Sequence, residues 1–334
     1  MPGGGLGFVA EKTIKISRRQ ELRNSRRGKL RNQVDLHLMM LPALLVVLVF
    51  SYLPMYGIII AFKDYQPTGG FWGIISSPWV GLKHFKTIFG GNGLHADPFM
   101  LRSVFNSVGI SFFRIVLLFP LPIFLAVMFN EIKNTTIKRT YQTISYFPYF
   151  VSWPIICSMV QMWLSPSIGW VNAFLKAVGI IDAPITFLSE PEWFWAITLA
   201  LECWKNIGFS TIIFLAAISG IDQEQYEAAT IDGATRMQKI RFITLPAMAG
   251  VITILFILQI PGIIGGNFDV SYLLGNASNA ERSMILQTYT YIMGMQKARF
   301  SYSTAIGLVT SFVSLILLLG GNGLVRKITK RGLF

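Results

Sequence analysis

Three ionisable residues, Arg114, Glu202 and Lys205, stand inside long apolar stretches of the sequence. Charge inside such a stretch is costly and usually serves a function. Glu202 and Lys205 are three residues apart, so an α-helix would place them on one face. At 1.5 Å per residue, Glu202 would lie roughly 14 Å and Arg114 about 15 Å from the outer ends of their segments. We therefore expect the three charges at one level, either as an ion-pair cluster that orients helices or along the path of a solute.

The sequence has no pattern typical of a catalytic or metal-binding site. His37, His84 and His95 are scattered, without metal-ligand spacing such as H-E-x-x-H, and there is no catalytic triad or carboxylate cluster. Cys157 and Cys203 fall in apolar stretches and are expected to be small buried apolar residues. The phosphate-binding pattern G-x-x-x-x-G-K-[ST] is missing too. We therefore expect no catalytic residue, metal or cofactor in this chain, and a membrane enzyme is a weak alternative.

The composition indicates a membrane protein. Hydrophobic residues make up 53% of the 334 residues and charged residues 13%, and the mean hydropathy is +0.54. A soluble domain of this size carries about 25% charged residues. The net charge of +13 would suit nucleic acid, but Lys and Arg gather in tails and loops beside apolar segments. That distribution follows the positive-inside rule, so we expect the lipid bilayer as a partner and no nucleic acid.

Six stretches approach the roughly 20 apolar residues that a spanning helix needs. The fifth is interrupted by Pro and Gly, which spanning helices tolerate where they line a cavity. The first is too long for the apolar region of a cleavable signal, so we expect it to stay in place. The six expected spans are residues 38–62, 104–129, 143–164, 193–218, 246–264 and 304–319.

Lys and Arg set the orientation of these spans. Nineteen fall on one side of the six-span topology and eight on the other, so both termini are expected in the cytoplasm. The fold class is therefore all-α, a polytopic membrane protein with six transmembrane helices. Its expected parts are a basic cytoplasmic tail 1–37, a transmembrane domain 38–323 with a cytoplasmic loop 219–245, and a basic cytoplasmic tail 324–334.

The cytoplasmic loop 219–245 is polar but patterned. Asp222 can cap a first helix, with Gln three residues later, which is a variant of the capping box. Gly233 supplies a helix stop, because glycine tolerates a left-handed conformation. Thr235 with Gln238 repeats the capping pattern for a second helix. The pattern predicts two helices around a glycine turn, a rigid protrusion that can pass force from a partner to the spans.

The residues of this loop resemble the EAA motif, EAA-x3-G-x9-I-x-LP, of permease subunits of binding-protein-dependent ABC importers. Residues 50–67 (FSYLPMYGIIIAFKDYQP) and 77–82 (SPWVGL) are similar to the LplB-like group, the permeases of complex-sugar and oligosaccharide systems, which are related to maltose permeases. The resemblance runs from about residue 38 to the C-terminus. The matched motif positions are Glu227, Ala228, Ala229, Gly233, Ile243, Leu245 and Pro246.

The resemblance implies a type I ABC importer permease fold, in which a coupling helix docks in a groove on a cytoplasmic ATPase dimer. ATP and Mg would be bound by that separate ATPase. Glu227 and Asp232 are the expected charged contacts, and Gly233 fixes the bend. Carried over by position, the ATPase-coupling residues are Glu227, Ala228, Ala229, Asp232, Gly233, Arg236, Leu245 and Pro246.

The resemblance also implies a substrate path. In related maltose-type permeases, sugar contacts come from the spans before and after the motif. Polar groups and one aromatic ring at matching distances would suit a saccharide, neutral or acidic. Arg114, the first of the three charges described above, is added to these positions. The residues of the expected path are Arg114, Glu202, Lys205, Asn206, Phe209, Gln259, Gly262 and Asn267, with Gly266 nearby. Trp153 and Trp204 are expected to serve in packing.

The implied partners are a second homologous permease, giving a heterodimer, the ATPase dimer, and an extracytoplasmic solute-binding protein. The outer segments 165–188, with a short surface helix, and 268–299 are the expected docking faces for the binding protein. The implied location is the bacterial cytoplasmic (inner) membrane, as a multi-pass protein.

Two alternatives remain: the same machinery carrying a non-sugar solute, such as a glycerophosphodiester or peptide, and a secondary transporter or channel that works alone.

Overall fold

The computed structural model describes residues 34–90, 97–329 and 332. Most of the expected basic tail 1–37, together with His95, Lys330 and Arg331, lies outside them. All named elements in the described residues are helical, and Lys63 and Trp79 form an isolated antiparallel bridge. The all-α expectation is confirmed. The chain divides into two units, residues 1–59 and 60–334, which are described separately.

The described part of the first unit is one apolar helical run. It comprises α2 (Val34–Val47), the π-helical turn η1 (Leu48–Tyr52) and the beginning of the 3-10 helix η2 (Leu53–Phe62). The whole candidate span, His37–Phe62, has a hydropathy of 2.4, and none of its most apolar window is buried within the protein. An apolar surface of this kind suits a lipid environment.

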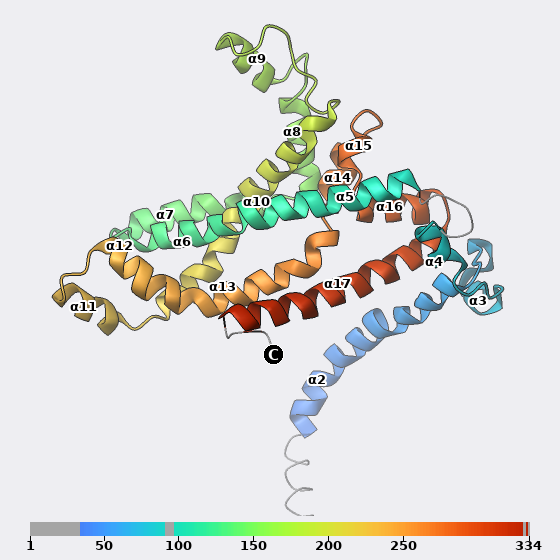
Figure 1. Ribbon diagram of the computed structural model, residues 1–334, viewed down its shortest axis with the longest axis horizontal. Coiled ribbons are helices and arrows are strands. Elements are labelled where there is room, and N and C mark those ends of the chain that lie inside the picture. Colours follow the sequence, from blue (N-terminus) through green and yellow to red (C-terminus); the bar gives the residue numbers. More distant parts are fainter. Residues whose placement is uncertain (1–33, 91–96, 330–331, 333–334) are drawn as a thin grey trace, which may run out of the picture. The chain divides into compact units, whose positions relative to one another are not determined.

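The second unit contains four long candidate spans, which match the expected second, fourth, fifth and sixth spans. They are Pro98–Asn130, Pro191–Ser219, Arg236–Leu274 and Phe300–Lys327. Their helices are visible in Figure 1 from α5 to α17. The elements are α5 (Pro98–Phe113), η4 (Arg114–Leu118), α6 (Pro120–Asn130), α10 (Pro191–Ser219), α12 (Arg236–Lys239), η6 (Ile240–Thr244), α13 (Leu245–Gln259), η7 (Ile260–Ile264), α14 (Phe268–Leu274) and α17 (Phe300–Thr329).

The third span differs from the straight helix expected over residues 143–164. The helical segments Thr135–Phe150 and Trp153–Trp163 meet at 94°, and counting this bent pair as one span gives six in the described residues. Val151 and Ser152 are extended between them. Pro154 contributes to the break, because proline has no N–H to donate to the Phe150 carbonyl oxygen, as a continuous helix would require. The elements here are α7 (Thr135–Tyr146), η5 (Phe147–Phe150) and α8 (Trp153–Trp163).

Shorter helices complete the second unit. The expected surface helix within 165–188 is confirmed as α9, which follows Gly169. The loop 219–245 carries α11, followed by α12. The remaining elements are η3 (Pro67–Gly69), α3 (Gly70–Ser76), α4 (Lys83–Ile88), α9 (Trp170–Ala177), α11 (Gln223–Ile231), α15 (Ala280–Ser283), α16 (Leu286–Tyr291) and η8 (Ile292–Gln296).

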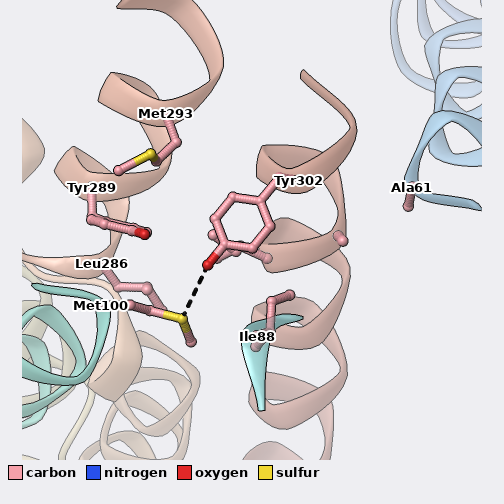
Figure 2. Close-up of a cluster of buried hydrophobic side chains, with 9 residues drawn as sticks. Ala61, Ile88, Met100, Leu286, Tyr289, Met293 and Tyr302 are labelled. Atoms are coloured by element: carbon pink, nitrogen blue, oxygen red, sulfur yellow. Dashed lines mark hydrogen bonds between the residues drawn. The ribbon is translucent and has the colours of Figure 1, made fainter. Parts of the chain in front are cut away.

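One buried cluster joins α4, α5, α16, η8 and α17. Figure 2 shows Met100, Tyr289 and Tyr302 in it, with the Tyr302 hydroxyl donating to the Met100 sulfur at 3.7 Å. The Tyr289 hydroxyl donates to Asp97 Oδ2 at 2.7 Å. Burial and this hydrogen bond raise the pKa of Tyr289, so the phenol stays protonated as a donor. The cluster therefore packs these five elements together and contains a buried tyrosine, Tyr289, whose hydroxyl has a hydrogen-bond partner.

Two further clusters lie along α10. One joins α10 to α8 and α14 and contains Cys157, which is buried among apolar side chains as expected. The other joins α10 to α6 and α13 through Phe214 and Met248. Helix α10 is therefore the common packing partner of the elements that surround the candidate site.

Gly208 of α10 yields a first prediction, because α7 approaches it closely. A Cβ atom at this position would lie 2.1 Å from the backbone oxygen of Ser145. We expect Gly208→Ala to lower the free energy of unfolding by about 1–3 kcal/mol, since either backbone must move. Thermal unfolding of the purified protein in detergent measures the effect.

Gly307→Ala is the matched control, because Gly307 lies in α17 with open space where the Cβ would be. It should leave the unfolding midpoint unchanged or raise it slightly, as alanine favours a helix. Equal midpoints for the two variants would show that the close approach of α7 and α10 is not a packing constraint.

Candidate functional site

A cavity of about 600 Å³ lies among η4, α6, η5, α8, α10, α13 and the chain that leads into α14. Six of the eight residues expected along the substrate path line it, namely Arg114, Glu202, Asn206, Phe209, Gln259 and Asn267. Gly266 lines it as well, whereas Lys205 and Gly262 do not. The fold thus brings residues from the second, fourth and fifth spans to one place.

The break in the fifth span forms one wall of the cavity. Helix α13 ends at Gln259, and the chain leaves helical geometry after η7, where Gly266 has a φ of +100°. A side chain at Gly266 would be strained and would also meet Ile285 at 2.9 Å. Asn267 then begins α14, its Oδ1 accepting the Val270 N–H at 3.3 Å. This irregular backbone lines a cavity, the setting in which membrane proteins tolerate it.

Arg114 holds this broken segment in place. Its Nη2 donates to the Gly262 carbonyl oxygen at 3.0 Å and to Ser111 Oγ at 3.2 Å. Ser111 Oγ also donates to the Gly262 oxygen, at 3.2 Å. A Cβ on Gly262 would lie 3.3 Å from Arg114 Nη2. The small residue therefore lets the guanidinium approach the backbone, and Gly262 contributes an anchor for Arg114 rather than a surface of the cavity.

Lys205 does for the third span what Arg114 does for the fifth. Its Nζ donates to the Tyr149 carbonyl oxygen at 2.7 Å and also to the Val151 carbonyl oxygen. Both carbonyls lie at the 94° bend, where no helix continues to satisfy them. The ammonium also lies 5.4 Å from the ring centroids of Tyr149 and Trp153, within cation–π distance. Lys205 stabilises the bend and supports two of the cavity-lining rings, but does not itself line the cavity.

Glu202 has no such partner. Its side chain is only 5% exposed and lines the cavity, yet its Oε2 has no hydrogen-bond partner. Within the part of the chain that the structure describes, no ion pair within 4.0 Å joins Glu202 to Arg114 or Lys205. The carboxylate has a side-chain hydrogen bond with Asn267 and an electrostatic interaction with Arg114. Of the two alternatives for these charges, the structure does not show the ion-pair cluster, because each cation donates to main-chain carbonyls and one oxygen of the Glu202 carboxylate has no partner.

Aromatic rings form another part of the lining. Tyr149 and Phe209 stack with centroids 3.8 Å apart and planes 4° apart. Trp153, expected only in packing, lines the cavity beside them. Tyr149, Trp153 and Asp269 also line the cavity, and the sequence patterns did not predict them. The prolines on either side of residue 151 are the signal that could have indicated a bend there. Ring faces together with carboxylate, amide and guanidinium groups suit a solute that has both hydroxyl groups and apolar faces.

The loop 219–245 has the two helices and glycine turn that the sequence predicts. Asp222 Oδ1 accepts the Glu224 N–H at 3.1 Å, so Asp222 caps α11, but the expected capping box with Gln225 does not form. Gly233 has a φ of +77°. The second capping box is complete, with Thr235 N–H donating to Gln238 Oε1 at 2.7 Å. These caps fix the loop locally in a defined shape.

The expected coupling residues lie on the surface of this loop. Glu227, Ala228, Asp232, Gly233, Arg236, Leu245 and Pro246 are exposed, and Ala229 is half-buried. Large apolar side chains are exposed among them, with Ile231 88%, Met237 70% and Phe242 68% accessible. Among residues 34–90, 97–329 and 332, no group of three or more His, Cys, Asp or Glu side chains could hold a metal ion.

The sequence is similar to known transport proteins over most of its length. Residues 119–331 match the family described as binding-protein-dependent transport system inner membrane component. Protein LplB of Bacillus subtilis (strain 168) is 40% identical over 299 residues, covering 90% of this chain and 91% of that protein. The polygalacturonan/rhamnogalacturonan transport system permease protein YteP of the same organism is 40% identical over 306 residues, 92% of each chain.

A solved structure is similar over almost its entire length. It is the crystal structure of a bacterial alginate ABC transporter in complex with an alginate pentasaccharide-bound periplasmic protein. One of its chains is 35% identical, with a TM-score of 0.79, and the match covers 92% of this chain and 99% of that chain. At this identity the similarity extends beyond the general arrangement of helices.

The role of Lys205 can be tested by Lys205→Met, which keeps an unbranched apolar stem and removes the donor. Two carbonyl oxygens would lose their partner, and each buried unsatisfied acceptor costs about 1–3 kcal/mol. We expect a clearly lower thermal unfolding midpoint of the purified protein.

Lys176→Met, in the exposed last turn of α9, is the control and should leave the midpoint unchanged. If Lys205→Met were as stable as this control, the Lys205 ammonium would not be stabilising the bend of the third span.

Proposed function

We propose that this chain is the membrane-spanning permease subunit of an ATP-driven saccharide importer. The chain belongs to the family of binding-protein-dependent transport system inner membrane components. The proposal rests on one observation above all. The cavity combines stacked aromatic rings with Glu202, a nearly buried carboxylate that lacks a partner for one oxygen. A sugar hydroxyl would donate to that oxygen, and sugar ring faces would pack on the aromatic rings.

The size and position of the cavity support the proposal. Its volume of about 600 Å³ falls in the range of about 300–1,000 Å³ that is usual for small-molecule sites. It is lined by Asn206 and Phe209 from the fourth span and by Gln259 from the fifth. These spans flank the cytoplasmic loop in the sequence, so the solute contacts and the loop are connected through continuous helices.

The chemical class of the saccharide follows less directly. YteP is named for polygalacturonan and rhamnogalacturonan transport, and the similar solved structure for alginate. In this chain the cavity lining has Arg114 as a cation and Glu202 and Asp269 as anions. Arg114 would bind a uronate carboxylate, whereas Glu202 favours hydroxyl donors. The proposal therefore covers oligosaccharides and polysaccharide fragments, both neutral and acidic.

The cytoplasmic loop is the proposed contact with a separate ATPase dimer, which binds ATP and Mg. Exposed Ile231 and Met237 offer apolar area, and Glu227 and Asp232 offer charge beside them. An apolar patch with a charged rim is typical of a protein interface. In this arrangement both termini lie in the cytoplasm.

The remaining proposed partners are a second homologous permease, forming a heterodimer, and a solute-binding protein on the outer side. Segments 165–188 and 268–299 are the proposed contacts with the binding protein. The first has an exposed apolar surface in and around α9, with Trp170 57% and Phe174 58% accessible. Exposed aromatic side chains of this kind are enriched where proteins bind one another.

Glu202→Gln tests the solute site. The amide keeps the shape but weakens an acceptor whose hydrogen bonds are worth about 1.5–3 kcal/mol when charged. We expect uptake of the transported saccharide by the reconstituted importer to fall about 10- to 100-fold, with assembly of the complex intact. The measurement is uptake into proteoliposomes across a panel of neutral and acidic oligosaccharides.

Glu192→Gln, exposed in the first turn of α10, is the matched control and should transport normally. If Glu202→Gln transported each saccharide of the panel as the wild type does, the cavity would not be the solute site.

Glu227→Lys tests the ATPase contact. Reversing this exposed charge should prevent co-purification of the ATPase and abolish uptake, because like charges across an interface oppose binding. Glu131→Lys, in the loop after α6, reverses a charge outside the proposed contact and should retain the ATPase. Equal recovery of the ATPase with both variants would contradict the proposed role of α11.

A further inference from the structure

Within the loop 219–245, helix α11 is bonded through a buried residue to η6, the turn that leads into α13. The Tyr226 hydroxyl on α11 lies 2.9 Å from Thr244 Oγ1 on η6. Thr244 is 2% exposed, and Tyr226 is half-buried. Most other polar contacts of the loop are at its surface, where water competes for each hydrogen bond. The buried contact therefore resists separation more strongly than the exposed ones.

Either hydroxyl can donate in this hydrogen bond. Thr244 Oγ1 also lies 3.4 Å from the carbonyl oxygen of Lys239, a longer and weaker contact. The resulting chain of bonds runs from α11 through Thr244 to the main chain at the end of α12.

A second contact lies alongside the first. Lys239 Nζ donates to Thr230 Oγ1 at 2.7 Å, and Thr230 Oγ1 donates to the Tyr226 carbonyl oxygen at 2.6 Å. Both bonds are exposed to water. They fix the direction in which α11 leaves the base of α13, but the buried contact at Thr244 is the one that water cannot replace.

After Thr244 the chain continues without interruption as helix α13. Helix α13 begins at the next residue, and Met248 in its first turn is fully buried against Phe214 of α10. The 15 residues of α13 end at Gln259, which lines the cavity. At 1.5 Å per residue this helix spans about 22 Å. Displacement of α11 would therefore reach the cavity wall through one packed helix.

We propose that Tyr226 and Thr244 are positioning residues that transmit the movement of the cytoplasmic loop to α13. The inference rests on the proposed function and adds the connection by which the ATPase contact reaches the solute cavity. With the hydrogen bond in place, α11 and α13 move as one body. Without it, α11 can follow the ATPase while α13 stays, so ATP is hydrolysed without transport.

The test uses the complete importer reconstituted in proteoliposomes, with uptake and ATP hydrolysis measured on the same preparation. Tyr226→Phe keeps the ring and removes its hydroxyl, and Thr244→Val keeps the shape and removes the other hydroxyl of the bond. Each should lower the amount of saccharide transported per ATP by about 2- to 10-fold, as expected for the loss of one hydrogen bond. The rate of ATP hydrolysis should stay near that of the wild type.

Two further variants separate this role from a structural one. The double variant Tyr226→Phe/Thr244→Val should be no worse than either single variant, because both remove the same bond. Thr244→Ser keeps the hydroxyl and should restore the transport ratio. Thr310→Val, which removes an equivalent hydroxyl bonded within α17, is the control and should match the wild type.

The inference fails if the transport ratio is unchanged in both single variants, or if the losses add in the double variant. It also fails if ATP hydrolysis and uptake fall together with an unchanged ratio, since that pattern indicates a docking or folding defect. A wild-type complex that transports no saccharide would instead refute the proposed function. The two failures are thus distinguishable.

Discussion

The constraint on which this structure depends is that backbone carbonyls inside a membrane protein need partners within the protein. Two spans break beside the cavity, one at Val151–Ser152 and one after Ile264, and each break frees carbonyl groups. Lys205 binds two carbonyls at the break of the third span, and Arg114 adds a hydrogen bond to the Gly262 carbonyl beside the break of the fifth, which also accepts the Gly265 N–H. The cost of burying a cation is thereby offset by hydrogen bonds to main-chain oxygens. The breaks, and the cavity that they open, persist because these two side chains reach them.

Helix α10 joins this constraint to the rest of the unit. It carries Lys205 toward the bend, Glu202 toward the cavity, and Gly208 against α7. These residues are spaced by three and so lie along one face at successive levels, which lets a single helix position a support, a ligand group and a close contact. The clusters with α8 and α14 on one side and with α6 and α13 on the other keep α10 in register with both broken spans.

Much of this arrangement could be predicted from the sequence, since it depends on local patterns. Apolar length located the spans, capping residues located α11 and α12, and Gly233 marked the turn. The functions of Lys205 and Arg114 could not be predicted, because their partners are carbonyl groups that bear no sequence signal. A charge in a span indicates that a partner exists, but not whether it is a side chain, a solute or the backbone. The bend at residue 151 had a local cause in Pro154, yet its angle depends on how α8 packs against α14.

Some residues around the cavity hold the backbone breaks, and others present side chains to the solute. This difference affects how proteins of this kind can diversify. The cations that hold the backbone breaks bind carbonyls, which every amino acid has, whereas Glu202, Asn206, Phe209 and Gln259 present only their side chains to the cavity. Replacing those four leaves the supports of the scaffold untouched. A new cargo can therefore be acquired by a few substitutions, without a new fold and without loss of the membrane architecture. The scaffold of this permease is in that sense evolvable, and it is a practical starting point for redirecting import to other solutes.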